Sequence, residues 1–259
     1  MRRGWWLALL VVSLSGGLAE ADVWTGGGPE CLPAVADYDG DGKADLAQLC
    51  SGAMHFYGPT GTYLKGIWIG NVPNLRPVAA DFNGDGRDDV AVYHDGAWFG
   101  FNYTTGALEW GIYTGGTAAA VPVPMDSNGD GQAELALFDG GAWHFFNADG
   151  SYNRGVYTGT LAGDVIVPGD YNGDLIEDLV MFRAGTWFFF HPTTGAVINA
   201  VFTAAGEPAP LDFDGDGSLD FTVFADGAWH FYNDNGSYRG GLWAGTASNI
   251  RPLSRRHLP

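Results

Sequence analysis

Alternate acidic residues on a nine-residue stretch rich in glycine, Asp37 to Asp45, have the residue types and spacing of a cation-binding loop. Its acidic side chains, at positions 1, 3, 5 and 9, are Asp37, Asp39, Asp41 and Asp45. Calcium takes six to eight oxygen ligands, and alternate carboxylates on a tightly turned loop converge on one point. Glycines at positions 4 and 6 allow the left-handed backbone that such a turn needs. The stretch therefore predicts a site for a hard divalent cation, with a backbone carbonyl added from position 7.

Five copies of this loop occur along the chain, and their first aspartates lie 44, 45, 44 and 42 residues apart. In the second to fifth copies the side-chain ligands are predicted to be Asp81, Asn83, Asp85 and Asp89; Asp126, Asn128, Asp130 and Glu134; Asp170, Asn172, Asp174 and Asp178; and Asp212, Asp214, Asp216 and Asp220. The position-7 carbonyls belong to Lys43, Arg87, Gln132, Ile176 and Ser218. A fixed period of this length indicates a repeat architecture.

Two copies depart from the pattern. Leu175 takes position 6 of the fourth loop, where the others have glycine, so we expect a strained or rearranged backbone there and a weak or empty site. Glu134 replaces the position-9 aspartate of the third loop, which is milder because the longer carboxylate can still reach the cation.

The segments between the loops predict four short strands per repeat. An apolar run follows each loop, then a turn, an aromatic strand such as AWHFF from Ala142, a second turn and a fourth strand. In the aromatic strand Trp143 and Phe145 point to one face while His144 and Phe146 point to the other, so neither face is plainly polar. Four-stranded sheets packed on both faces are the blades of a β-propeller, and a period near 44 matches one blade. We predict an all-β, five-bladed propeller with repeats at about 29–71, 72–116, 117–160, 161–204 and 205–247.

The two ends of the chain suggest processing and closure. Residues 1–21 combine Arg2 and Arg3, a short apolar run and a small-residue exit, which is typical of a secretory signal peptide. The apolar run is too short for the alternative, a membrane anchor. Residues 22–259 then form one domain, in which 23–27 copy a fourth strand and 249–254 copy a first strand. These orphan strands either close the ring within one chain or pair with another molecule.

Charge and cysteine content limit the partners and the compartment. The formal charge is −18 with only 12 Lys and Arg, which disfavours nucleic acid. The acidic residues concentrate in the loops. Cys31 and Cys50 flank the first loop, so a bridge is geometrically plausible if the loop joins antiparallel strands; two free buried thiols are the alternative. No second apolar stretch of spanning length follows the signal.

These loops, the apolar strand after each and the period together resemble the FG-GAP and VCBS-type calcium-binding propeller repeats, over about residues 23–254. The resemblance implies structural calcium in the loop positions already named, with the fourth site in doubt. It does not fix a function, because such propellers serve adhesion, carbohydrate binding and scaffolding. Lectin relatives bind between blades, which would suit Trp98, Trp143, Trp187 and Trp229; alternatively these residues fill equivalent blade interfaces, as Met54 in the first copy suggests.

Catalytic constellations are not evident, and we expect no enzyme. His55, His144 and His230 recur at one blade position, which favours a surface or interface role. We predict a secreted, cell-surface or periplasmic binding module, with a glycan or a surface protein as partner. The alternative is an extracellular structural protein whose terminal strands join copies into calcium-stabilised filaments.

Overall fold

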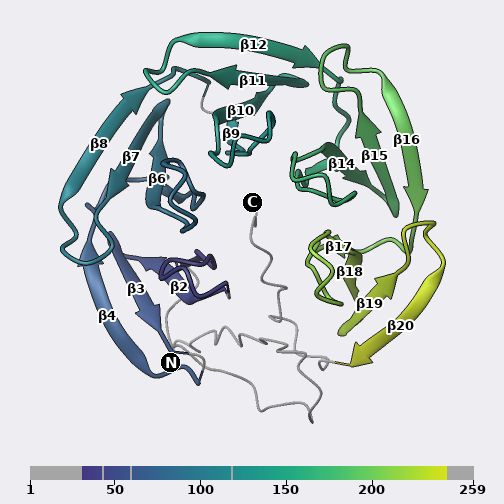
Figure 1. Cartoon of the computed structure of the whole chain (residues 1–259), viewed down its shortest axis with the longest axis horizontal. Helices are drawn as coiled ribbons and strands as arrows, with labels where there is room; N and C mark the ends of the chain where they lie inside the picture. The colour runs from purple at the N-terminus through teal and green to yellow at the C-terminus, as the bar shows by residue number, and fades with distance from the viewer. Residues whose placement is uncertain (1–30, 43, 59, 118, 244–259) are drawn as a thin grey trace, which may run out of the picture.

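The computed structural model describes residues 31–243 except 43, 59 and 118, and it confirms the predicted fold. Five antiparallel four-stranded sheets form the blades of a ring, each in the order first to fourth strand along the chain (Figure 1). The protein is a five-bladed β-propeller. The signal peptide and the orphan strands predicted at 23–27 and 249–254 lie outside the described residues.

Each blade begins near the axis with a two-residue strand and ends on the perimeter with a six-residue strand (Figure 1). Blades 1 and 2 contain β1 (Leu32–Pro33), β2 (Leu46–Cys50), β3 (Ala53–Tyr57) and β4 (Tyr63–Trp68), then β5 (Arg76–Pro77), β6 (Val90–His94), β7 (Ala97–Phe101) and β8 (Leu108–Tyr113). Blade 3 contains β9 (Val121–Pro122), β10 (Leu135–Asp139), β11 (Ala142–Phe146) and β12 (Tyr152–Tyr157). Blades 4 and 5 contain β13 (Val165–Ile166), β14 (Leu179–Arg183), β15 (Thr186–Phe190) and β16 (Val197–Phe202), then β17 (Glu207–Pro208), β18 (Phe221–Ala225), β19 (Ala228–Tyr232) and β20 (Tyr238–Trp243).

The first four residues of the second strand of every blade are buried, so both faces of this strand are covered. In β10 the first four residues are buried, whereas the outer strand β12 is mostly exposed. Hydrophobic clusters join each blade to the next from blade 1 to blade 5. Val90 and Val92 of blade 2, for example, pack with Met54 and Phe56 of blade 1. The core is therefore a set of blade junctions, as the two-faced aromatic strands predicted.

Three of the four recurring tryptophans, Trp98, Trp143 and Trp187, pack in clusters that join two blades, whereas Trp229 packs with residues of its own blade. Trp98, Trp143 and Trp187 are fully buried and Trp229 is 4% exposed. The first three donate from Nε1 to the hydroxyls of Thr114, Thr158 and Thr203, at 2.9, 3.2 and 3.0 Å. Of the two alternatives, blade-interface filler is confirmed for Trp98, Trp143 and Trp187, and all four tryptophans are too buried to stack on a ligand.

A disulfide joins Cys31 to Cys50, so the first of the two alternatives left open by the sequence is correct. The pairing of Leu32 with Leu49 brings the two cysteines together across the first hairpin. Within the described residues, no helix has the length and hydropathy to span a bilayer. The disulfide is consistent with an oxidising compartment.

Candidate functional site

Each acidic loop is organised by its first aspartate. Asp37 accepts the Gly40 N–H on Oδ1 at 2.7 Å and the Gly42 N–H on Oδ2 at 2.8 Å. The same two bonds recur at Asp81, Asp126, Asp170 and Asp212. Gly40 and Gly42 have φ of 78° and 80°, which is why glycine suits positions 4 and 6.

The carboxylate at position 9 closes the loop. Asp45 and Asp89 each accept the N–H of the position-2 residue, Tyr38 or Phe82, at 3.0 Å. Asn83 at position 3 donates to the other oxygen of Asp89 at 2.8 Å. Asn128 makes the equivalent bond to Glu134, so the longer acid of loop 3 does reach across its loop.

Burial and crowding make the position-9 carboxylates unfavourable as anions. Burial, and secondarily the charges of neighbouring loop acids, raise the pKa of Asp89 and of Asp178 to about 6. The pKa values of Asp45, Glu134 and Asp220 are raised for the same first reason. A divalent cation between these oxygens would remove the repulsion, so the all-oxygen donor set fits a hard cation.

Three of the five loops bring at least three carboxylates within 4.8 Å of one another in the described part of the chain. The groups are Asp37, Asp39 and Asp41; Asp126, Asp130 and Glu134; and Asp212, Asp214 and Asp220. Loops 2 and 4 form no such acidic group among those residues, and asparagine at position 3 does not by itself explain this, because loop 3 also has it, as Asn128. Of the predicted ligands, only Lys43 lies outside the described residues.

Leu175 adopts the glycine conformation and does not rearrange loop 4. Its φ is 67°, and its N–H donates to Asp170 Oδ2 at 2.8 Å, as Gly42 does to Asp37. Its side chain is 76% exposed, so it meets no packing barrier. The expected strain is present as a left-handed leucine, while the expected rearrangement is not.

Adjacent loops are joined through position 8, which the sequence analysis did not single out. The N–H groups of Asp88, Ala133, Glu177 and Leu219 donate to the position-1 carbonyl of the preceding loop. Asp88 and Glu177 add a side-chain bond, accepting the N–H of Asp37 and of Asp126 at 2.8 and 3.0 Å. The sequence does set these two residues apart, because only the second and fourth loops have an acidic residue at position 8.

Loop 5 differs because an arginine reaches its acids. Arg239 on β20 donates from Nη1 to Asp214 at 2.9 Å and lies 3.7 Å from an Asp220 oxygen. Both are predicted metal ligands. The guanidinium thus supplies positive charge where the other loops would use a cation.

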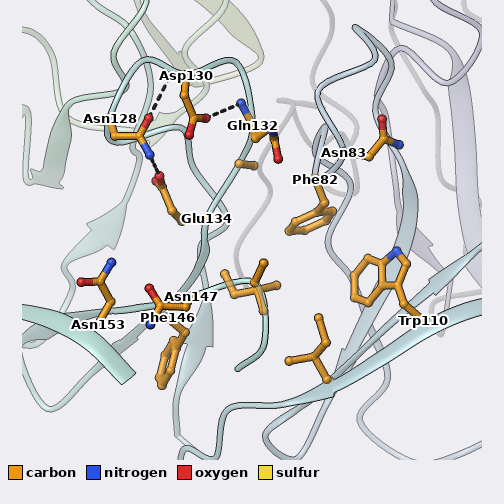
Figure 2. A pocket seen from close by; sticks show the side chains of 14 residues that line it. Phe82, Asn83, Trp110, Asn128, Asp130, Gln132, Glu134, Phe146, Asn147 and Asn153 are labelled. Atoms are coloured by element: carbon orange, nitrogen blue, oxygen red, sulfur yellow. Dashed lines mark hydrogen bonds between the residues drawn. The ribbon is translucent and has the colours of Figure 1, made fainter. Parts of the chain in front are cut away.

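A pocket of about 500 Å³ lies between blades 2 and 3, on the side of the acidic loops (Figure 2). Phe82, Trp110 and Ile112 form its blade 2 wall. Opposite them, Figure 2 shows Asn128, Asp130 and Glu134 of loop 3 above Phe146, Asn147 and Asn153 of blade 3. Among described residues, the lining has aromatic, amide and carboxylate groups but no lysine, arginine or histidine.

Trp110 is the aromatic residue that the sequence analysis missed. It lies on β8, opposite Gly100 of β7, and packs edge-on against Phe82 at 5.4 Å between ring centroids. The buried tryptophans drew attention because they repeat, whereas Trp110 occurs in one blade only. Its isolation within the repeat was the available signal.

The recurring histidines serve the blade surface, as predicted. His55, His144 and His230 each lie 6.0 Å from a tyrosine of the neighbouring outer strand, measured between ring centroids. This repeated contact is structural packing and includes no second metal-binding group.

Comparison with known proteins supports the fold. A lectin from Agrocybe aegerita that specifically recognises non-reducing terminal N-acetylglucosamine is similar, with a TM-score of 0.55 and 14% identity over 85% of this chain and 67% of the lectin. A Bacteroides caccae protein of unknown function has a TM-score of 0.52 and 12% identity, over 82% and 74% of the two chains. The Photorhabdus luminescens Tc holotoxin pore has a TM-score of 0.50 and 16% identity, over 81% of this chain but only 12% of the toxin chain.

No protein-family model matches the sequence, and no curated protein matches it. The fold implied by the FG-GAP and VCBS resemblance is therefore present, while membership of that family is not shown. The structure defines a five-bladed propeller with three clusters of acidic loop residues that could hold metal ions.

Proposed function

We propose that this protein is a secreted, non-catalytic carbohydrate-binding module whose site is the pocket between blades 2 and 3. The observation that carries the proposal is the exposed face of this pocket, in which an indole adjoins a set of amides. Sugars offer an apolar C–H face for an aromatic ring and hydroxyls for amide and carboxylate groups. Binding sites of this kind combine apolar walls with a few convergent polar groups.

The polar lining favours a neutral ligand. Asn83, Asn128, Gln132, Asn147 and Asn153 provide amide donors and acceptors. When ionised, Asp130 and Glu134 can accept hydrogen bonds but cannot donate them. The described lining also has no cationic side chain that could bind an acidic group of a ligand. We therefore expect neutral saccharides to bind in preference to sialylated or sulfated ones.

Calcium has a structural part in this proposal. Cations in up to five loops, with the fourth in doubt, would neutralise the crowded carboxylates and hold each first hairpin, including that of loop 3, which has one of the three acidic groups and forms one wall of the pocket. The pocket carboxylates Asp130 and Glu134 are predicted ligands of that cation. Carboxylates that ligate a structural cation are not free to act as a general acid or base, which is why we propose binding without catalysis.

The structurally similar Agrocybe lectin makes N-acetylglucosamine the first saccharide to test. A glycan array probed in millimolar calcium should give signals for neutral glycans, and isothermal titration calorimetry should then give an affinity. Trp110→Ala should remove binding, because the indole forms the apolar wall. Tyr113→Ala is the matched control, since Tyr113 lies on the same strand but is 71% exposed on the perimeter.

An array without any glycan signal, or full affinity in the Trp110→Ala protein, would overturn the proposal. Both proteins should melt within a few degrees of the wild type, which separates loss of the site from loss of the fold.

A further inference from the structure

Four blade junctions are built from the same four positions, so their differences can be compared directly. The positions are loop position 2, the fourth residue of the third strand, the residue paired with it on the outer strand, and a turn residue of the next blade. In chain order the junctions contain Tyr38, Phe56, Lys65 and Tyr103; Phe82, Gly100, Trp110 and Ala148; Ser127, Phe145, Arg154 and Pro192; and Tyr171, Phe189, Asn199 and Asp234.

At the junction of blades 1 and 2, Tyr103 fills the space. Its ring stacks on Tyr38 with centroids 6.0 Å apart and planes 7° from parallel, and it meets the Phe56 ring edge-on at 5.0 Å. The Lys65 ammonium lies over the Tyr103 ring, 2.9 Å from its centroid, and donates to the Tyr103 carbonyl. A planar six-membered ring of the chain itself thus occupies this junction.

At the junction of blades 3 and 4, Arg154 fills the space. Its guanidinium lies 3.7 Å from the centroid of the Phe145 ring. It also donates to the Pro192 carbonyl at 3.0 Å and to the Ser127 hydroxyl at 2.8 Å. A planar group with several hydrogen bonds again takes the place between the blades.

At the junction of blades 2 and 3, both fillers are missing. Ala148 stands where Tyr103 stands one junction earlier, and Trp110 replaces Lys65 and Arg154. Trp110 lies against Gly100, where a Cβ atom would come within 2.0 Å of the indole. Phenylalanine occupies this position in the neighbouring blades, so glycine is needed for the indole to lie flat and line the pocket.

We propose that the junctions of blades 1 and 2 and of blades 3 and 4 are latent copies of the ligand site, occupied by Tyr103 and Arg154 of the chain itself. The stacked tyrosine ring and the stacked, hydrogen-bonded guanidinium take the place that a saccharide ring takes between blades 2 and 3. These two side chains thereby set the number of sites at one among these three junctions. The inference rests on the proposed function.

The test exchanges the fillers between junctions. Ala148→Tyr should close the pocket between blades 2 and 3 and abolish calorimetric binding of N-acetylglucosamine, or of the neutral saccharide with the strongest wild-type array signal. Asp149→Tyr adds the same ring at the next turn position, which is exposed and does not line the pocket, and is the matched control. Tyr103→Ala should open a further site and raise the stoichiometry by one over that of the wild type. Arg154→Ala should do the same and serves as a second variant if Tyr103→Ala fails to fold.

The outcomes separate the two proposals. Loss of binding in Ala148→Tyr, with the wild-type stoichiometry unchanged in both Tyr103→Ala and Arg154→Ala, would overturn the latent sites and leave the pocket as the binding site. Unchanged binding in Ala148→Tyr would overturn the pocket, and the latent sites with it. A wild-type protein that binds no saccharide would overturn both.

Discussion

The acidic loops near the axis and the blade junctions further out both recur with the repeat. The loops keep the same hydrogen bonds in every copy, whereas the junctions differ in their side chains. All five loops keep the same two bonds from the first aspartate, even where leucine replaces glycine. The compared junctions place four unlike sets of side chains at the same positions. The loops are thus constant in their bonding, and under the proposed function the varied junction residues would decide where a ligand can bind.

The loops vary little because each must hold several carboxylates close together in one geometry. Clustered carboxylates must be spaced by backbone donors or neutralised by a cation, so few sequences suffice. A junction needs only to be filled, and a tyrosine, an arginine or an external molecule can each fill it. Breaking the loops should therefore damage the whole molecule, whereas changing a junction should alter only its own site.

Removing cations should have the largest effect. Each filled loop would stabilise the protein by about 2.7 kcal/mol at a cation concentration about 100-fold above its Kd. Excess chelator should therefore lower the Tm by many degrees in differential scanning calorimetry, and millimolar calcium should restore it. Magnesium at the same concentration is the control for ionic strength. An unchanged melting curve in chelator would remove the calcium hypothesis.

Truncating a buried filler should have the next largest effect. Trp143→Ala should cost about 3–5 kcal/mol of unfolding free energy, because it removes a fully buried indole and leaves a cavity. Trp110→Ala should cost much less, since its side chain already borders a pocket. Urea unfolding of both variants measures the difference. Equal losses would mean that Trp110 is a core residue and not part of an open site.

The fold could be predicted from the sequence because the same sequence pattern recurs in each blade. The period, the two-faced strands such as β11 and the glycines of each loop all required four-stranded blades. The Cys31–Cys50 bridge was one of two open alternatives, and the hairpin pairing decides it. The buried Trp143 was correctly expected to be a filler because it recurs.

The pocket could not be predicted in the same way, because it depends on contacts between blades. Aligning the repeats shows that Gly100 takes the position of a phenylalanine in the other blades. It does not show that the Trp110 ring lies over Gly100. It shows Ala148 opposite Tyr103, but not that Tyr103 stacks on a loop residue of the preceding blade. The bonds of Asp88 and Glu177 to preceding loops were hidden for the same reason.

A non-repeated ion pair gives a smaller effect with a defined pH dependence. Burial disfavours the Asp164 carboxylate, but hydrogen bonds from Arg183 and from the Leu161 N–H outweigh it and lower the pKa of Asp164. Because the folded pKa lies below the unfolded value of about 3.9, this stabilisation is present above that pH and is lost as pH falls through the folded pKa. Asp164→Asn should cost about 1.5–3 kcal/mol at pH 7.

The variant and the wild type should converge in stability as the pH drops well below 4, because protonated Asp164 no longer attracts Arg183. Urea unfolding at pH 7 and at the lowest pH where both remain folded checks this. A constant difference between the two proteins across that range would show that the carboxylate charge is not what stabilises this part of blade 4.

Replacing Arg239 should give the smallest effect and the sharpest comparison among loops. Its guanidinium competes with any cation for Asp214 and Asp220. Arg239→Gln should therefore raise the cation affinity of loop 5 severalfold and leave the other loops unchanged. Calcium titration followed by calorimetry, with the exposed Tyr238→Ala as control, measures the change. Identical titration curves would mean that the arginine moves aside without cost and that loop 5 binds as loops 1 and 3 do.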